Sequence, residues 1–163
     1  MNLSGHVCRL VAWCFPRYNL LIMDQTTHHQ IFQTRFQVTP RVIDKNGHVN
    51  NVTYVQWMQD LAVRHYESLG GVELTRSMGA TWVVRSHHIV YHNPAFEGDW
   101  IEARTWVVNL RKVRSLRRYQ FLRISDGKML VEGETDWVFV EIQSGRLLAI
   151  PPEIAELFRL LKD

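Results

Sequence analysis

Residues 44–57 read DKNGHVNNVTYVQW, and a long helix begins within this stretch. Downstream, apolar side chains recur at steps of three and four residues, as on one face of a helix. The stripe consists of Val55, Met58, Leu61, Ala62, His65 and Leu69, and Tyr54 and Trp57 widen it. Gly70 and Gly71 end the pattern. The sequence predicts one long helix, covered over much of its circumference.

The segments around this helix alternate between apolar and polar residues, which is typical of half-buried strands. The alternation predicts strands at about 31–38, 82–92, 100–110, 115–125 and 129–142. Pro151 and Pro152 open a short terminal helix. One long helix with a run of antiparallel strands predicts an α+β domain whose sheet curls round the helix.

The chain has 163 residues, of which 46% are hydrophobic and 21% charged, so one globular domain is expected. We assign it to residues 24–163. Residues 1–23 resemble nothing that follows and are interpreted as an extension, or as a sign that translation begins at Met23. Their apolar run is interrupted by polar residues, so no membrane span is predicted. Cys8 and Cys14 form neither a disulfide framework nor a zinc pattern, which favours a reducing, cytoplasmic compartment.

More polar groups precede the long helix than capping requires. One Asn or Asp satisfies a helix start, and Asn50 fits that role. The free N–H groups of the first turn can stabilise an oxyanion, and Asp44 stands just before them. Gly47 allows the backbone to approach a ligand closely. A carboxylate beside a helix N-terminus suits acyl-group hydrolysis, although Asp44 taken singly is more typical of a turn or cap, and His48 of a loop.

The run D-K-N-G-H-V-N-N-V-T-Y resembles the signature of the hotdog-fold acyl thioesterases. It is most similar to the Asp-x-Asn-x-His-Val-Asn-Asn-x-x-Tyr run of acyl-ACP thioesterases, and more loosely to the Asp-x-x-Gly-x-Val segment of the hydroxybenzoyl-CoA group. The resemblance implies a hotdog fold, a curved antiparallel sheet wrapped around one long central helix. It also implies a homodimer or homotetramer with acyl pockets at the subunit interface, acting on acyl-CoA or acyl carrier protein in fatty acid metabolism. No cofactor is implied, since coenzyme A or phosphopantetheine enters as part of the substrate.

The same resemblance assigns roles to individual residues. Asp44 matches the catalytic carboxylate, Asn46 and His48 match its polar companions, and Asn51 supplies a backbone N–H to the thioester carbonyl. Gly47 and Tyr54 are expected to contact the substrate. The chain departs from the acyl-ACP pattern after the second strand, where it reads YHNPAF (91–96) in place of a further acid or thiol. A simpler site centred on Asp44 is therefore expected.

Seven basic residues and no acid lie between residues 103 and 125: Arg104, Arg111, Lys112, Arg114, Arg117, Arg118 and Arg123. They form either a solvated strand face or a patch for the phosphates of coenzyme A or of a carrier arm. Arg111, Lys112, Arg114 and Arg117 are the candidates for that patch, because they flank a turn. The spacing of His87, His88 and His92 is not that of metal ligands, so no metal site is predicted.

Three other functions are weighed against thioester hydrolysis. A hydratase or dehydratase on the same fold requires a different His-containing signature. A non-catalytic protein could bind nucleic acid or an acyl carrier through the basic strands 104–123, to which the net charge of +3 is suited. An accessory subunit could hold acyl chains without hydrolysing them. The resemblance favours the enzyme, and no nucleic acid partner is expected.

Overall fold

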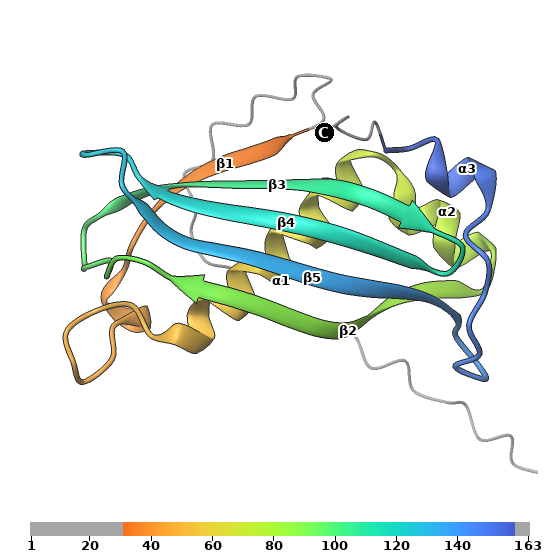
Figure 1. Cartoon of the computed structure of the whole chain (residues 1–163), viewed down its shortest axis with the longest axis horizontal. Helices are drawn as coiled ribbons and strands as arrows, with labels where there is room; N and C mark the ends of the chain where they lie inside the picture. The colour runs from red at the N-terminus through yellow and green to blue at the C-terminus, as the bar shows by residue number, and fades with distance from the viewer. Residues whose placement is uncertain (1–30, 159–163) are drawn as a thin grey trace, which may run out of the picture.

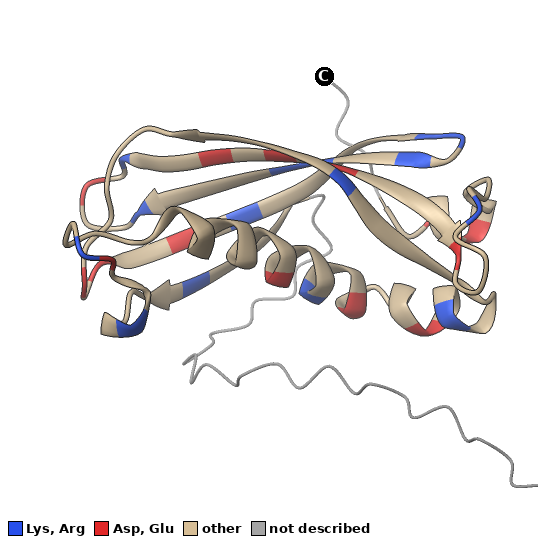
Figure 2. Cartoon of the chain, turned by 90° about the horizontal axis from the view of Figure 1, so that it is seen from below, with Lys and Arg blue, Asp and Glu red and all other residues tan. Residues whose placement is uncertain are grey.

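The computed structural model describes residues 31–158, which form one curved antiparallel sheet with a long helix along its concave face (Figures 1 and 2). The strands are β1 (Phe32–Gln37), β2 (Ala80–Tyr91), β3 (Trp100–Arg111), β4 (Arg114–Arg123) and β5 (Met129–Glu141). The helices are α1 (Asn51–Ser68), α2 (Gly71–Ser77) and α3 (Pro152–Ala155), with a 3-10 turn η1 at Pro40–Val42. The predicted α+β class, the five strands and the long helix are confirmed.

The strands lie in the order β1-β3-β4-β5-β2, and every neighbouring pair is antiparallel. The sheet therefore ends at β1 on one side and at β2 on the other (Figure 1). β2 is 12 residues long, and its exposed apolar side chains include Val83, Val90 and Tyr91. Within residues 31–158 its outer edge has no strand partner, so its backbone groups are available for pairing.

Helix α1 packs on the sheet through a stripe of buried side chains: Tyr54, Met58, Leu61, Ala62, His65 and Tyr66. Gly133 on β5 makes the close approach possible, because a Cβ there would lie 2.7 Å from the Met58 sulfur. Val52 and Val63, which flank this stripe on α1, are exposed. Among the described residues the sheet thus covers one side of the helix, less than the sequence analysis expected.

A second helix, α2, follows α1 almost at once and was not predicted. Gly70 and Gly71 were interpreted only as an end signal, and α1 does end at Ser68. Gly70 adopts a left-handed conformation with φ of 72°, which suits a residue without a side chain. Gly71 then begins α2 against the ring of Tyr66, where any Cβ would lie 2.1 Å from a ring carbon. The two glycines therefore fold α2 back against the end of α1.

Several sequence predictions fall on the chain ends. The extension at residues 1–23, the alternative start at Met23 and both cysteines lie outside residues 31–158. The terminal helix is present as α3, which Pro151 and Pro152 open as predicted. None of the helices described between residues 31 and 158 is long and apolar enough to cross a membrane.

Candidate active site

Residues 44–48 form a tight loop immediately before α1. Ile43 and Val49 pair across its base, the Asp44 N–H donates to the His48 carbonyl at 2.9 Å, and the Gly47 N–H donates to the Asp44 carbonyl at 3.0 Å. Gly47 has φ of 83°, a conformation that glycine adopts without strain. The Asp, Asn, Gly and His residues thus build a separate hairpin rather than a cap.

The carboxylate of Asp44 is fixed by its own loop. Its Oδ1 accepts a hydrogen bond from the Asn46 N–H at 2.8 Å, and its Oδ2 lies 3.5 Å from the Asn46 side-chain nitrogen. The His48 Nδ1 lies 3.8 Å from the same Oδ2. The Asp44 side chain is 21% exposed, so its carboxylate is accessible to a small reactant. The structure therefore brings Asp44, Asn46 and His48 together, as the sequence predicts.

The start of α1 has the cap that the sequence predicts. The Asn50 side chain accepts from the Val52 N–H at 2.9 Å, and the Asn50 backbone N–H donates to the Val42 carbonyl at 2.9 Å. The N–H of Asn51, the first residue of the helix, donates to no acceptor within residues 31–158. It lies at the positive end of an 18-residue helix. This N–H is available to an oxyanion.

Tyr54 and Tyr91 link this helix start to the sheet. Tyr54 is 2% exposed and packs edge-on against Trp57, Tyr91 and Phe121, and burial raises the pKa of its hydroxyl. The structure thus places Tyr54 in the core, which does not favour the predicted substrate contact in a single chain. The Tyr91 hydroxyl donates to the Asn51 carbonyl at 3.2 Å. Sequence reasoning missed this contact, because nothing local relates the end of β2 to the start of α1.

The YHNPAF segment contains no acid or thiol, and it contacts both β5 and the Asp44 loop. The Asn93 side chain donates to the Met129 carbonyl at 2.7 Å, which ties the segment to β5. The Ala95 carbonyl accepts from the Val49 N–H at 2.9 Å and so supports the base of the Asp44 loop. The segment therefore has a structural part in positioning Asp44.

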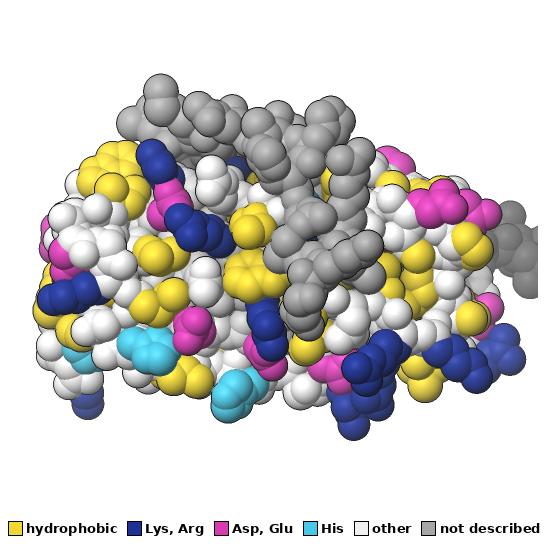
Figure 3. Space-filling model, turned by 45° about the horizontal axis from the view of Figure 1, so that its top comes forward, with side chains coloured by type: hydrophobic (Ala, Val, Ile, Leu, Met, Phe, Trp, Pro, Cys, Tyr) yellow, Lys and Arg dark blue, Asp and Glu magenta, His cyan; other side chains and the backbone are white. Residues whose placement is uncertain are grey.

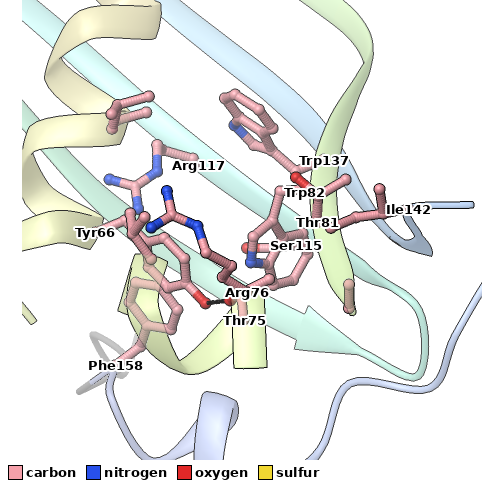
Figure 4. A pocket seen from close by; sticks show the side chains of 14 residues that line it. Tyr66, Thr75, Arg76, Thr81, Trp82, Ser115, Arg117, Trp137, Ile142 and Phe158 are labelled. Carbon is pink, nitrogen blue, oxygen red and sulfur yellow. Dashed lines mark hydrogen bonds between the residues drawn. The ribbon is translucent and has the colours of Figure 1, made fainter. Parts of the chain in front are cut away.

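A cavity of about 260 Å³ lies at the other end of α1, between that helix, α2 and the sheet (Figure 4). Its walls are mostly aromatic and aliphatic, and the aromatic members are Tyr66, Trp82, Trp137 and Phe158. Two arginines, Arg76 from α2 and Arg117 from β4, also line it. An α-helix of 18 residues is about 27 Å long, so Asp44 and this cavity lie far apart within one chain.

The basic run does not form a continuous patch. Carboxylates from the sheet or its connecting loops pair with four of its members, Arg104, Arg114, Arg118 and Arg123. Figure 3 shows cationic and anionic side chains interspersed over the visible face. Arg111 and Lys112 are exposed at the β3–β4 turn, as predicted, and Arg114 next to them contacts Asp136 at 3.6 Å. Arg117 is 4% exposed, so it cannot join these three in a surface patch.

His87 on β2 and His92 just after that strand have separate neighbours. The His87 Nδ1 lies 2.8 Å from the Thr135 hydroxyl, and the His92 Nε2 lies 3.1 Å from a Glu132 oxygen. Between residues 31 and 158 no group of three or more His, Cys, Asp or Glu side chains has the arrangement of a metal site.

Comparison with known proteins identifies the family. Residues 38–158 match the thioesterase-like superfamily. A chloroplastic palmitoyl-acyl carrier protein thioesterase from Cuphea hookeriana is 24% identical over 131 residues, which are 76% of this chain and 32% of that protein. The chain thus spans about a third of that relative's length. The protein belongs to the thioesterase-like superfamily.

Solved structures of similar fold agree with this family. A 12:0-ACP thioesterase from Umbellularia californica has a TM-score of 0.73 and 20% identity, covering 82% of this chain and 52% of that one. A 1,4-dihydroxy-2-naphthoyl-CoA thioesterase from Synechocystis has a TM-score of 0.70 and 16% identity, covering 78% of this chain and 94% of that one. The fold is the hotdog fold, as the sequence resemblance implied.

Proposed function

We propose that this protein is an acyl thioesterase that hydrolyses an acyl-CoA or acyl-ACP to a free acid and a thiol, with Asp44 as its catalytic carboxylate. The observation that carries the proposal is the Asp44 loop, which presents an accessible carboxylate directly before a helix N-terminus. The N–H of Asn51 has no acceptor within residues 31–158 and is the proposed oxyanion donor. Membership of the thioesterase-like superfamily supports the same reaction.

The chemistry requires little more than these two groups. Water attacks the carbonyl carbon, Asp44 takes its proton, and the carbon–sulfur bond breaks to release a thiolate. A thiol of pKa about 8.5 leaves readily without a strong acid. In the alternative route Asp44 attacks directly, and water then hydrolyses the mixed anhydride. In both routes the Asn51 N–H stabilises the oxyanion, and Asn46 and His48 orient water or the carbonyl.

The cavity at the far end of α1 fits the same function if two copies of the chain associate. Antiparallel pairing of two β2 edges about a two-fold axis sets the Ala80 end of one strand beside the Tyr91 end of the other. Ala80 lines the cavity, whereas Tyr91 contacts Asn51 at the helix start. In such a homodimer, or in a tetramer built from it, each cavity lies next to the partner's Asp44 loop and can hold the acyl group.

The exposed basic residues at the β3–β4 turn bear on the thioester donor. Arg111, Lys112 and Arg114 are the proposed contacts for the phosphate groups of coenzyme A or of a carrier protein's phosphopantetheine arm. A nucleic-acid binder is less well supported, because four of the seven basic residues in the run contact carboxylates. A cytoplasmic location remains a prediction from the cysteines.

The decisive experiment replaces Asp44 by Asn and measures thiol release across acyl-CoA and acyl-ACP donors. Asn retains the side-chain oxygen that accepts from the Asn46 N–H, so the loop should keep its shape. It removes the charge and the basicity. Loss of a general base predicts a decrease in kcat of about 100-fold to 10,000-fold.

Asp126 provides a matched control. Its Oδ1 accepts from the Lys128 N–H at 3.1 Å in the same manner, but in the turn between β4 and β5. Asp126→Asn should leave kcat near the parental value. Parental activity in folded Asp44→Asn, or an equal loss in both variants, would reject Asp44 as the catalytic carboxylate.

A further inference from the structure

Arg117 is the most unusual charged residue among those described. It projects from β4 beneath α1 and is 4% exposed. Its guanidinium donates to the His65 Nδ1 at 2.9 Å and to the Thr105 hydroxyl at 3.2 Å, and it lies 5.8 Å from the centre of the Phe158 ring. No carboxylate within residues 31–158 pairs with it. A buried charge without a counter-ion is costly.

The neighbours of Arg117 do not neutralise it. A guanidinium stays protonated at neutral pH even where burial lowers its pKa, as it does here. His65 beside it is neutral, because burial and the charge of Arg117 lower the pKa of that imidazole to about 3. His65 and Thr105 therefore act as hydrogen-bond acceptors without negative charge. Within residues 31–158 no negative charge balances that of Arg117.

The cavity is where that balance can be supplied. Arg117 lines it, and Arg76 from α2 brings a second guanidinium to the same space (Figure 4). No Asp or Glu of residues 31–158 lines this cavity, although Glu73 contacts Arg76 at 3.2 Å. The indole N–H of Trp82, another lining residue, is buried and has no acceptor within residues 31–158. The Trp137 N–H is also buried and lies near the Tyr119 hydroxyl. The described lining thus offers two guanidinium groups, of which Arg117 lacks a carboxylate partner within residues 31–158, and the unsatisfied Trp82 N–H.

The cavity is also of a size to hold an organic group. At about 260 Å³ it exceeds the roughly 150 Å³ apolar cavity that accommodates benzene. Its aromatic walls suit a hydrocarbon chain or ring, whereas its donors suit an anion. A ligand that matches both has an apolar body and a negatively charged end. Arginine can bind a carboxylate through two parallel hydrogen bonds, which favours this anion.

We propose that the cavity binds an acyl group that ends in a carboxylate, with Arg117 as the counter-ion of that carboxylate. The substrate class is then the mono-thioester of a dicarboxylic acid. Naming the substrate in this way rests on the proposed thioesterase function, whereas carboxylate binding in the cavity does not. The same site can take the free dicarboxylic acid, which is the product of the reaction.

The test compares charged and neutral acyl groups of equal length on the full-length protein. A series from succinyl-CoA to suberyl-CoA is assayed for thiol release beside the straight-chain monocarboxylic acyl-CoA of equal carbon number. At the best length, kcat/KM should be higher for the dicarboxylic thioester by at least about tenfold. Arg117→Gln should abolish that preference. Arg76→Gln, at an exposed position, should reduce it in a protein that folds normally.

Arg118→Gln is the matched control. Arg118 is the next residue along β4, lies exposed, and pairs with Glu134 at 2.8 Å. It should keep the parental preference. Calorimetric titration with the free dicarboxylic acid gives a readout without catalysis, and its binding should weaken by at least about tenfold in Arg117→Gln and less in Arg76→Gln.

The outcomes separate this inference from the proposed function. Arg117-dependent binding of the free acid by a protein that hydrolyses no thioester would retain the carboxylate site and reject the thioesterase. Hydrolysis with equal or better rates for the neutral acyl groups would reject the substrate class. A preference that persists in both arginine variants, or free acids that do not bind, would overturn the assignment of Arg117.

Discussion

The two ends of helix α1 differ in nearly every property that an active site uses. At the N-terminal end, Asp44 and Asn51 are accessible, polar and next to the positive end of the helix dipole. At the C-terminal end, a cavity of about 260 Å³ has aromatic walls and a buried cation. One end thus offers reactive groups and the other offers space for an acyl chain. The proposed thioesterase site needs both ends, which two associated chains would bring together.

The largest effect on stability is expected at the C-terminal end, from His65. Its pKa is about 3 in the folded protein and about 6.5 in a free imidazole, because burial and Arg117 oppose its protonation. The unfolded state therefore binds the proton first, and stability should fall as the pH drops from about 6.5 towards 3, by up to about 1.4 kcal/mol per pH unit.

The effect is measured by urea unfolding of the parental protein and of His65→Gln at a series of pH values. The Gln side-chain oxygen can still accept from Arg117 but does not titrate, whereas the carboxylates titrate alike in both proteins. The difference in unfolding free energy between the two proteins should change with pH below about 6.5. A constant difference would mean that His65 is not buried and neutral.

A smaller loss of stability is expected from Gly71→Ala at the same end. The added Cβ would meet the Tyr66 ring, which stacks on Phe158 and bonds to Thr75, so the ring cannot move aside easily. Overpacking of this kind costs about 1–3 kcal/mol, measured by urea unfolding. Tyr66→Ala should remove most of that penalty in the double variant. An equal penalty with and without the ring would show that the clash is not its cause.

The smallest effect is expected at the N-terminal end, from Asn50→Ala. Loss of the bond from the Val52 N–H to the Asn50 side chain should lower the unfolding free energy by about 1 kcal/mol. The cap and the reactive groups are separate, so kcat should change far less than in Asp44→Asn. A kcat as low as that of Asp44→Asn, in a protein of nearly parental stability, would show that the Asn50 cap takes part in catalysis. It would contradict the separation of the cap from the reactive groups.

Features that depend on neighbouring residues could be predicted from the sequence, whereas contacts between distant segments could not. Strand alternation, the stripe of α1, the Asn50 cap and the Asp44 loop depend on residues that are close in sequence, and all were readable. The pairing of Arg114 and Arg118 was not, because their acids, Asp136 and Glu134, come from another strand. The cavity draws its lining from α1, α2, three strands, Ile142 and Phe158, so no local pattern indicates it. Arg117 looked like its exposed neighbours, although its side chain faces inward.

Complementation between two inactive variants tests most directly whether the two ends meet across subunits. Asp44→Asn removes the carboxylate, and Val63→Trp fills the cavity from a position that is 36% exposed. If each site joins the Asp44 loop of one chain to the cavity of its partner, co-expressed chains should regain about a quarter of the parental activity, since half of the dimers then hold one intact site. Mixed dimers, verified by mass, that stay as inactive as the single variants would contradict this account.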